Sequence, residues 1–185
     1  MRIIAIIPAR GGSKRLINKN VYPLKGKPLI SYTIEACKKS SYIDEIYVSS
    51  DSVEILKIAI ESGAKAVERN QKFANDNTPK IVAVREALKQ DQIVADGVPD
   101  IIIIPQANSP QITAEVMDKG FELLLKHNLW EVMSADENGI QNAAFRIIRR
   151  EHIKNDFLSA HCGFITSNII DVHTLNDILQ LEKLL

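Results

Sequence analysis

The sequence contains very little cysteine: Cys37 and Cys162 are the only two among 185 residues. They lie far apart along the chain, whereas redox and metal-binding cysteines are typically paired at short spacing. Isolated cysteines of this kind are more often reduced residues of a hydrophobic core. The cysteine pattern therefore argues against a disulfide framework, a zinc site and a thiol-based redox function.

Long apolar runs and an excess of charge are also missing. No run approaches the roughly 18 to 20 residues of a membrane span, and the apolar start of the chain at residues 1–8 is too short for a signal peptide. The 23 Lys and Arg residues balance 23 Asp and Glu residues, so no overall field attracts nucleic acid or an anionic membrane. We expect a cytoplasmic protein without nucleic-acid or membrane partners, which holds any bound anion by a local cluster.

The pattern of the remaining residues predicts an α/β fold. Short strand-like runs alternate with amphipathic segments of helical length, as in a three-layer structure whose mostly parallel central sheet has helices on both faces. The isoleucines at 101–104 are apolar on both faces of a strand, which is typical of a central parallel strand. We expect strands at residues 2–7, 45–49, 100–104, 131–134, 144–149 and 162–166, and helices at 29–39, 53–62, 80–89, 114–127 and 175–184.

Three loop-like stretches interrupt this alternation, at residues 9–27, 69–79 and 106–113. The first and third follow directly on the C-terminal end of an apolar strand. Open α/β sheets bind their ligands in the crevice beyond these strand ends. The ligand site is therefore expected where these loops meet.

The first loop has the composition of a polyphosphate-binding loop. Gly11 and Gly12 leave the backbone accessible, so that successive N–H groups can point at phosphate oxygens. Four cations within ten residues supply the charge that a nucleoside triphosphate requires: Arg10, Lys14, Arg15 and Lys19. The spacing matches neither the P-loop nor the Gly-x-Gly-x-x-Gly fingerprint, which argues against a kinase and a dinucleotide oxidoreductase. A solvated surface loop is the alternative that composition alone leaves open.

The stretch IIPARGGSKRLINKNVYPLKGKPLI, residues 6–30, resembles the signature of the acylneuraminate cytidylyltransferases, which are the CMP-sialic acid synthetases and their relatives acting on other nonulosonic acids. Further blocks resemble that family in the same order, at residues 48–52, 69–78, 106–110 and 171–177. The resemblance implies one domain over residues 1–185 with the Rossmann-like fold of nucleotide-diphospho-sugar transferases. It further implies Mg²⁺-dependent transfer of CMP from CTP to an acidic sugar, with release of pyrophosphate.

The same resemblance implies roles for particular residues. The residues expected to bind the nucleotide are Ala9, Arg10, Gly11, Gly12, Ser13, Lys14, Lys19, Asn20, Arg69 and Asn77. Gln106 and Ser109 would face the sugar, and Asp171 would bind Mg²⁺ and act in catalysis with Arg10 and Lys19. A surface position before a turn is the alternative for Arg69. A helix-capping or turn role is the alternative for Asp171, although Asp177 and Thr174 are available for those duties.

The chain departs from the family pattern at two positions near the expected site. His173 stands where many relatives have a second carboxylate, and it would act as a base, support the metal site or cap the following helix. Gln111 and Ile112 stand where relatives commonly have Leu-Arg, so an expected arginine is missing. These departures keep two alternatives open: a nucleotidyltransferase of the same fold with another sugar acceptor, and a catalytically reduced nucleotide-binding subunit.

The region between residues 126 and 161 is shorter than in typical relatives, where it forms a dimerisation arm and part of the sugar pocket. The resemblance implies a homodimer that pairs through residues 128–160, with Trp130, Phe145 and Phe157 as candidate anchors. An altered acceptor pocket follows from the short arm. Three arginines in this region would either recognise a sugar carboxylate or form a charged strand edge: Arg146, Arg149 and Arg150.

Overall fold

Two isoleucine-rich strands form the centre of the sheet. β1 (Ile3–Pro8) and β6 (Ile101–Pro105) pair in parallel, with Ile3 opposite Ile101. Their isoleucines are buried on both faces, and β-branched side chains are stiff and favour extended backbone. These two strands therefore occupy the middle of the structure, as the apolar run at 101–104 predicts.

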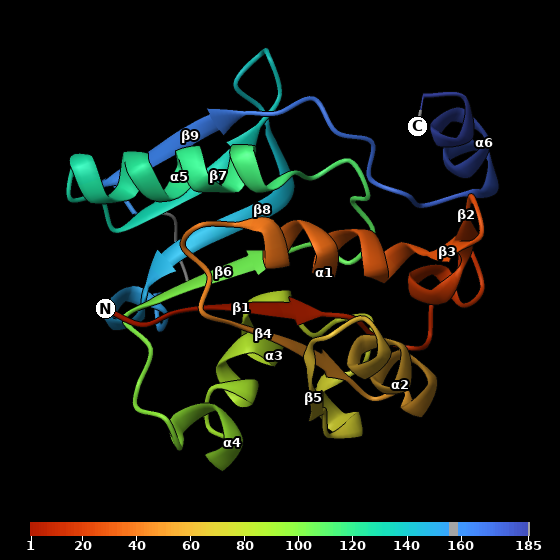
Figure 1. Ribbon diagram of the computed structural model, residues 1–185, viewed down its shortest axis with the longest axis horizontal. Coiled ribbons are helices and arrows are strands. Elements are labelled where there is room, and N and C mark those ends of the chain that lie inside the picture. The colour runs from red at the N-terminus through yellow and green to blue at the C-terminus, as the bar shows by residue number, and fades with distance from the viewer. Residues whose placement is uncertain (156–158, 185) are drawn as a thin grey trace.

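The computed structural model describes residues 1–155 and 159–184, and within these residues one seven-stranded sheet runs in the order β5-β4-β1-β6-β8-β7-β9 (Figure 1). β4 (Glu45–Ser50) and β5 (Lys65–Glu68) extend the parallel half beside β1. β7 (Glu131–Ala135) pairs in parallel with β9 (Cys162–Thr166), while β8 (Gln141–Arg149) is antiparallel to both β6 and β7. The prediction of a mostly parallel sheet is confirmed.

A tight turn explains the reversed direction of β8. Only five residues join β7 to β8, and a connection this short can link antiparallel strands only. Asp136 accepts hydrogen bonds at Oδ1 from the backbone N–H groups of Asn138 (2.9 Å) and Ile140 (2.8 Å). Gly139 has a φ of 76°, a left-handed conformation that glycine adopts at little cost.

Helices cover both faces of the sheet (Figure 1). α1 (Leu29–Lys39), α2 (Val53–Glu61) and α5 (Ala114–Lys126) pack on one face, and α3 (Lys80–Ala87) and α4 (Asp91–Val94) on the other. Ser52 and Thr113 cap α2 and α5 by accepting backbone N–H groups. The three-layer prediction is confirmed, since each amphipathic helix buries its apolar side against the sheet.

The last helix packs away from the sheet. α6 (Leu175–Leu184) lies beside the small hairpin of β2 (Pro23–Leu24) and β3 (Lys27–Pro28) (Figure 1). Its Ile178 and Leu181 share a separate apolar cluster with Leu24, Leu29 and Val172. This cluster holds the segment that precedes α6 against the end of the sheet where the first loop begins. Short 3₁₀ helices complete the fold: η1 (Lys19–Val21), η2 (Gln71–Phe73) and η3 (Arg150–His152).

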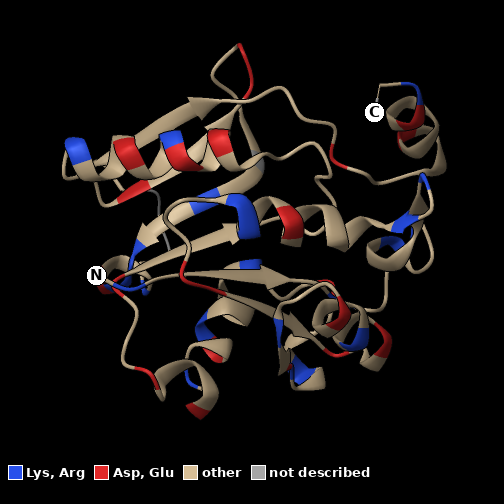
Figure 2. Ribbon diagram, viewed as in Figure 1, with Lys and Arg blue, Asp and Glu red and all other residues tan. Residues whose placement is uncertain are grey.

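Both cysteines are free, and burial raises the pKa of Cys37 to about 12, which keeps its thiol protonated and inert. Basic and acidic residues alternate over the helices rather than forming one-sided fields (Figure 2). None of the described helices is long and apolar enough to span a membrane.

Candidate active site

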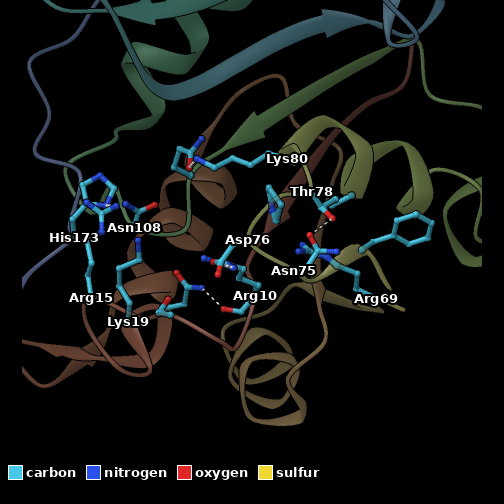
Figure 3. A pocket seen from close by; sticks show the side chains of 16 residues that line it. Arg10, Arg15, Lys19, Arg69, Asn75, Asp76, Thr78, Lys80, Asn108 and His173 are labelled. Carbon is cyan, nitrogen blue, oxygen red and sulfur yellow. Dashed lines mark hydrogen bonds and ion pairs between the residues drawn. The ribbon is translucent and has the colours of Figure 1, made fainter. Parts of the chain in front are cut away.

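A cavity of about 310 Å³ lies at the carboxyl ends of β1, β5 and β6. All three predicted loops contribute to its wall, as expected for an open α/β sheet. Arg15, Lys19 and His173 stand on one side and Arg69, Asn75 and Thr78 on the other, with Arg10 and Asp76 between them (Figure 3). Pro8, Ser13, Asn20, Phe73, Lys80, Ala83, Gln106 and Asn108 complete the lining.

Contacts with neighbouring segments hold the first loop against the sheet. Gly11 donates its N–H to Asp51 Oδ1 (3.0 Å), and a Cβ on Gly11 would lie 3.0 Å from the Cβ of Ser52. Asn20 is buried and donates from Nδ2 to the carbonyl of Arg10 (2.9 Å). The Ser13 N–H is also engaged, since it donates to the Gly11 carbonyl (2.9 Å), whereas a Cβ on Gly12 would meet no atom within 4 Å, so Gly12 is the point in this glycine pair that a phosphate can approach.

Lys19 is the most perturbed cation of the loop. It begins η1 and is half-buried. Burial first, and then the positive charges of Lys80, Arg15 and Arg10, lower its pKa to about 8, while the carboxylate of Asp171 opposes the shift. A crowded, partly desolvated cation whose charged form is disfavoured overall has less counter-charge nearby than it needs, so this end of the cavity is suited to a polyanion.

Arg69 is a buried part of the site rather than a surface residue, with 7% of its surface exposed. Its Nε donates to Ser49 Oγ (3.2 Å), and Nη2 donates to the Ser49 carbonyl. Burial lowers the pKa of Arg69, and the neighbouring carboxylate of Asp51 opposes that shift. The surface alternative for Arg69 is therefore excluded by its burial.

The structure does not bring Asn77 to the cavity, which corrects its expected place there. Asn75 Oδ1 accepts the backbone N–H of Asn77 (3.0 Å) and the hydroxyl of Thr78 (3.0 Å), a local turn typical of asparagine. Asn75, Asp76 and Thr78 line the cavity, whereas Asn77 is exposed and does not.

Asp76 connects two of the loops electrostatically. Its carboxylate pairs with the Arg10 guanidinium and, at 2.5 Å, with the Lys14 ammonium. These two cations lower the pKa of Asp76. In the described structure Asp76 therefore pairs with Arg10 and Lys14, two cations that the resemblance assigns to the triphosphate.

Replacing Asp76 with Asn is expected to strengthen pyrophosphate binding a few-fold at low ionic strength, because the anion no longer competes with an internal carboxylate. Calorimetry with inorganic pyrophosphate measures this. Weaker binding by the variant would contradict the prediction and show that Asp76 holds Arg10 and Lys14 in position.

The segment that carries Asp171 is attached to the third loop. Asn108 exchanges hydrogen bonds with Val172 in both directions, at 3.0 Å and 2.9 Å. Ser109 is fully buried and donates its hydroxyl to Asp171 Oδ1. Ser109 thus orients Asp171 and does not line the cavity, which corrects the expectation that it faces the sugar.

Gln106 does line the cavity, as predicted. It follows β6 directly, and its backbone is fixed from both sides: its N–H donates to the Ala144 carbonyl (2.9 Å), and its own carbonyl accepts from Thr33 Oγ1 (2.8 Å). Its side-chain oxygen accepts a hydrogen bond from Lys80. Lys80 as a whole is exposed, but the burial of its ammonium lowers its pKa, an effect that Asp171 opposes.

Asp177 performs the capping that was the alternative role for Asp171. Its Oδ2 accepts the backbone N–H groups of His173 (2.8 Å) and Thr174 (2.7 Å) at the start of α6. The His173 ring instead contacts Arg15, whose Nη2 lies 3.0 Å from Nδ1. Burial, then Lys19 and Arg15, lower the pKa of His173, so its imidazole is neutral near pH 7 and accepts from Arg15. Asp171 is thereby left without a capping duty.

Residues 4–165 match the family model described as cytidylyltransferase. The chain belongs to the cytidylyltransferase family. Family membership, predicted from residues 6–30 and the later sequence blocks, is confirmed, and the cavity lies where those blocks meet.

This cytidylyltransferase chain is similar to enzymes of nonulosonic acid activation. It is 34% identical over 142 residues to the pseudaminic acid cytidylyltransferase of Campylobacter jejuni, covering 74% of this chain and 59% of that protein. It is 40% identical over 124 residues to the CMP-N,N'-diacetyllegionaminic acid synthase of Legionella pneumophila, covering 66% and 53%. The chain therefore spans only about half to three-fifths of the length of these relatives.

The fold is also that of known cytidylyltransferases. A solved CMP:2-keto-3-deoxy-manno-octonic acid synthetase complexed with CTP superposes with a TM-score of 0.80 at 15% identity, covering 100% of this chain and 98% of that one. This likeness concerns the fold, and it confirms the predicted nucleotide-diphospho-sugar-transferase-like architecture.

Several residues that line the cytidylyltransferase cavity were not predicted from the sequence, and the charged side chains Asp76 and Lys80 are among them. Lys80 had a detectable signal, because it is the first residue of α3 and a cation at a helix N-terminus is unfavourable to the helix dipole. Such a local conflict indicates a functional or strained position. Asp76 lies within a block that resembles the family, but its ion pairs depend on how two loops approach each other.

Proposed function

We propose that this chain transfers CMP from CTP to an acidic sugar of the nonulosonic acid class and releases pyrophosphate. The observation that carries the proposal is the cation-lined cavity at the strand ends, where Arg10, Arg15 and a partly desolvated Lys19 face one space. Family membership supports the nucleotide, and the named activities of the relatives support the acceptor class.

The residues would act by positioning and by charge stabilisation. The anomeric hydroxyl of the sugar would attack the α-phosphorus of CTP. A P–O bond forms as the hydroxyl gives its proton to water, and the bond from the α-phosphorus to the departing pyrophosphate breaks. Arg10, Lys14 and Lys19 would stabilise the charge on the leaving group, as donors aimed at developing charge do. The transfer needs no covalent intermediate on the protein, because alignment of the reacting groups supplies much of the acceleration.

The residues present fit a magnesium ion of the kind that the family resemblance implies. Mg²⁺ prefers carboxylate oxygens, substrate phosphates and water, and needs few protein ligands. Asp171 uses Oδ1 for Ser109, while Oδ2 has no hydrogen-bond partner among the residues described. Within that same part of the chain no three His, Cys, Asp or Glu residues form a closed metal site. Asp171 would therefore hold the ion together with the triphosphate, and the ion would neutralise phosphate charge.

The test is pyrophosphate release from CTP, ATP, GTP and UTP with a panel of acceptors. The panel contains N-acetylneuraminic acid, 3-deoxy-manno-octulosonate, a neutral hexose and a hexose 1-phosphate. We expect release that requires CTP together with one of the two keto-sugar acids. Release only with the sugar phosphate would favour another acceptor class, and CTP binding without release would favour a catalytically reduced subunit.

We further propose that two copies pair through residues 128–160. Trp130 supports this proposal, because 37% of its surface is exposed and its ring stacks on His152 and His161, at centroid distances of 4.1 Å and 4.9 Å. The prediction that Phe145 anchors the dimer is wrong, since this residue is 1% exposed and packs in the core. Phe157 lies outside the described residues.

Sedimentation velocity at micromolar concentration is expected to show a dimer for the wild-type chain and a shift toward monomer for Trp130→Ala, because aromatic anchors carry a large share of interface energy. The melting temperature of the variant serves as a control for folding. A wild-type chain that sediments only as a monomer would refute the proposed dimer.

A further inference from the structure

A second cavity shares a wall with the cavity of about 310 Å³ described above, which is called the nucleotide cavity here because the proposed function places CTP in it. It has a volume of about 180 Å³, and Lys80 and Gln106 line both spaces. Group transfer requires the attacking hydroxyl to lie next to the α-phosphate. The space that adjoins the nucleotide cavity across these two side chains is therefore where an acceptor can react.

The second cavity has the mixed character of a sugar-binding surface. Ile81, Ile104 and Phe145 give it apolar walls, while Gln106 and Gln141 add amide groups. Apolar walls with a few convergent polar groups are typical of small-molecule sites. An acidic acceptor would also need a cation in this cavity to bind its carboxylate.

Arg146 lines this cavity, but its charge is already neutralised. Its Nε donates to Glu131 Oε2 at 2.7 Å, and its Nη2 pairs with the same oxygen. Glu131 is 1% exposed, so the pair is held in the interior, where losing one partner would leave a buried charge. The pairing disfavours recognition of a sugar carboxylate by Arg146, and the strand-edge alternative is wrong for this residue because β8 lies inside the sheet between β6 and β7.

The third loop adds no cation to this space either. Gln111 accepts the backbone N–H of Ile170 (2.9 Å), and Ile112 is 4% exposed. These two residues stand where relatives commonly have Leu-Arg, so one expected arginine is missing here. Gln106 is the one residue of this loop that lines the second cavity, so any positive charge has to come from another element.

Lys80, unlike Arg146, has a positive charge that no carboxylate of the described residues neutralises by an ion pair. Its ammonium donates to Gln106 Oε1, and among residues 1–155 and 159–184 no carboxylate lies within ion-pair distance of it. An ammonium has three N–H donors, so two remain for a ligand. The bond to Gln106 holds the ammonium at the wall between the cavities, and Gln106 is itself fixed by Ala144 and Thr33.

We propose that Lys80 binds the carboxylate of the acidic acceptor in the second cavity and thereby selects acids over neutral sugars. The acceptor class in this assignment rests on the proposed cytidylyl transfer. The choice of Lys80 rests on its place in the wall between the two cavities. A role on the triphosphate is the competing possibility. It is disfavoured because the first loop supplies Arg15 and Lys19, in addition to the cations paired with Asp76, and because the partner of Lys80 is Gln106, not a residue of that loop.

The experiment compares Lys80→Met, Lys80→Arg and wild type on two acids, N-acetylneuraminic acid and 3-deoxy-manno-octulosonate, and on their methyl esters. The ester removes the charge and keeps the sugar. Lys80→Met should raise the KM for the acid about tenfold or more, the scale of a lost charge-assisted hydrogen bond. The KM values for CTP and for the ester should stay within about twofold, and Lys80→Arg should recover part of the preference for the acid. Lys57→Met, an exposed lysine on α2, is the matched control.

Equal increases in KM for acid and ester, or an increase confined to CTP, would overturn the assignment. Calorimetry of acceptor binding separates this failure from failure of the proposed function. If wild type releases no pyrophosphate with any acceptor but binds the acid, and Lys80→Met does not, the transfer reaction is rejected and the carboxylate site stands. If wild type and Lys80→Met bind the acid equally, or neither binds it, the carboxylate site is rejected.

Discussion

Asp171→Asn is expected to lower turnover about 100-fold or more while leaving the fold and most of the CTP affinity intact. Asn keeps an oxygen that can accept the Ser109 hydroxyl, so the attachment to the third loop survives. It lacks the charge that would hold Mg²⁺ beside the phosphates under the proposed function, and losing a metal that neutralises developing charge costs several kcal/mol. Activity should return in part at high Mg²⁺ or with Mn²⁺. Steady-state kinetics at several metal concentrations measure both effects.

Asp177→Asn is the matched control, because it changes an aspartate six residues further along the same segment. Asp177 accepts the N–H groups that begin α6, and Asn keeps an oxygen that can accept them, so this replacement should leave both the melting temperature and turnover close to wild type. Near-wild-type turnover of Asp171→Asn at low Mg²⁺ would contradict the metal role. Measuring the melting temperature of both variants separates loss of catalysis from loss of folding.

Lys19→Ala has the second-largest expected effect, a rise of about tenfold or more in the KM for CTP or an equal loss of turnover. The reason is the removal of a half-buried cation, worth roughly 1.5 to 3 kcal/mol in charged hydrogen bonds. Initial rates at saturating acceptor measure this change. Lys38→Ala, which removes an exposed lysine from α1, is the control. Unchanged CTP kinetics in Lys19→Ala would remove Lys19 from the site.

The pH dependence of CTP binding provides an independent test of Lys19. Its pKa is about 8 because burial and neighbouring cations disfavour the charged form. Below pH 8 Lys19 is protonated and attracts the triphosphate, and above it the charge is lost, so CTP affinity should fall as the pH rises through about 8. Lys19→Arg stays charged throughout and should abolish this fall. Calorimetry between pH 7 and pH 9 decides the point.

Strongly patterned elements were predictable from the sequence because local chemistry determines them. The isoleucine-rich strands β1 and β6 and the amphipathic helices α1 and α5 lie within one or two residues of their predicted bounds. β5 was missed, since this four-residue strand buries only Val67 fully and has little periodicity. α4 is a single turn and was missed for the same reason.

For the site, the sequence by itself determined the first loop with its glycines and cations, because residues adjacent in the chain remain adjacent in space. It also determined the family, and with it the expectation for Asp171. Only the tertiary structure decided which side chains are free to act. Ser109 is turned to Asp171, Asn77 is held outside the cavity by Asn75, and Arg146 is neutralised by Glu131. Each of these contacts depends on burial and on partners, which for Ser109 and Arg146 lie many residues away, and residue order alone does not encode those distances.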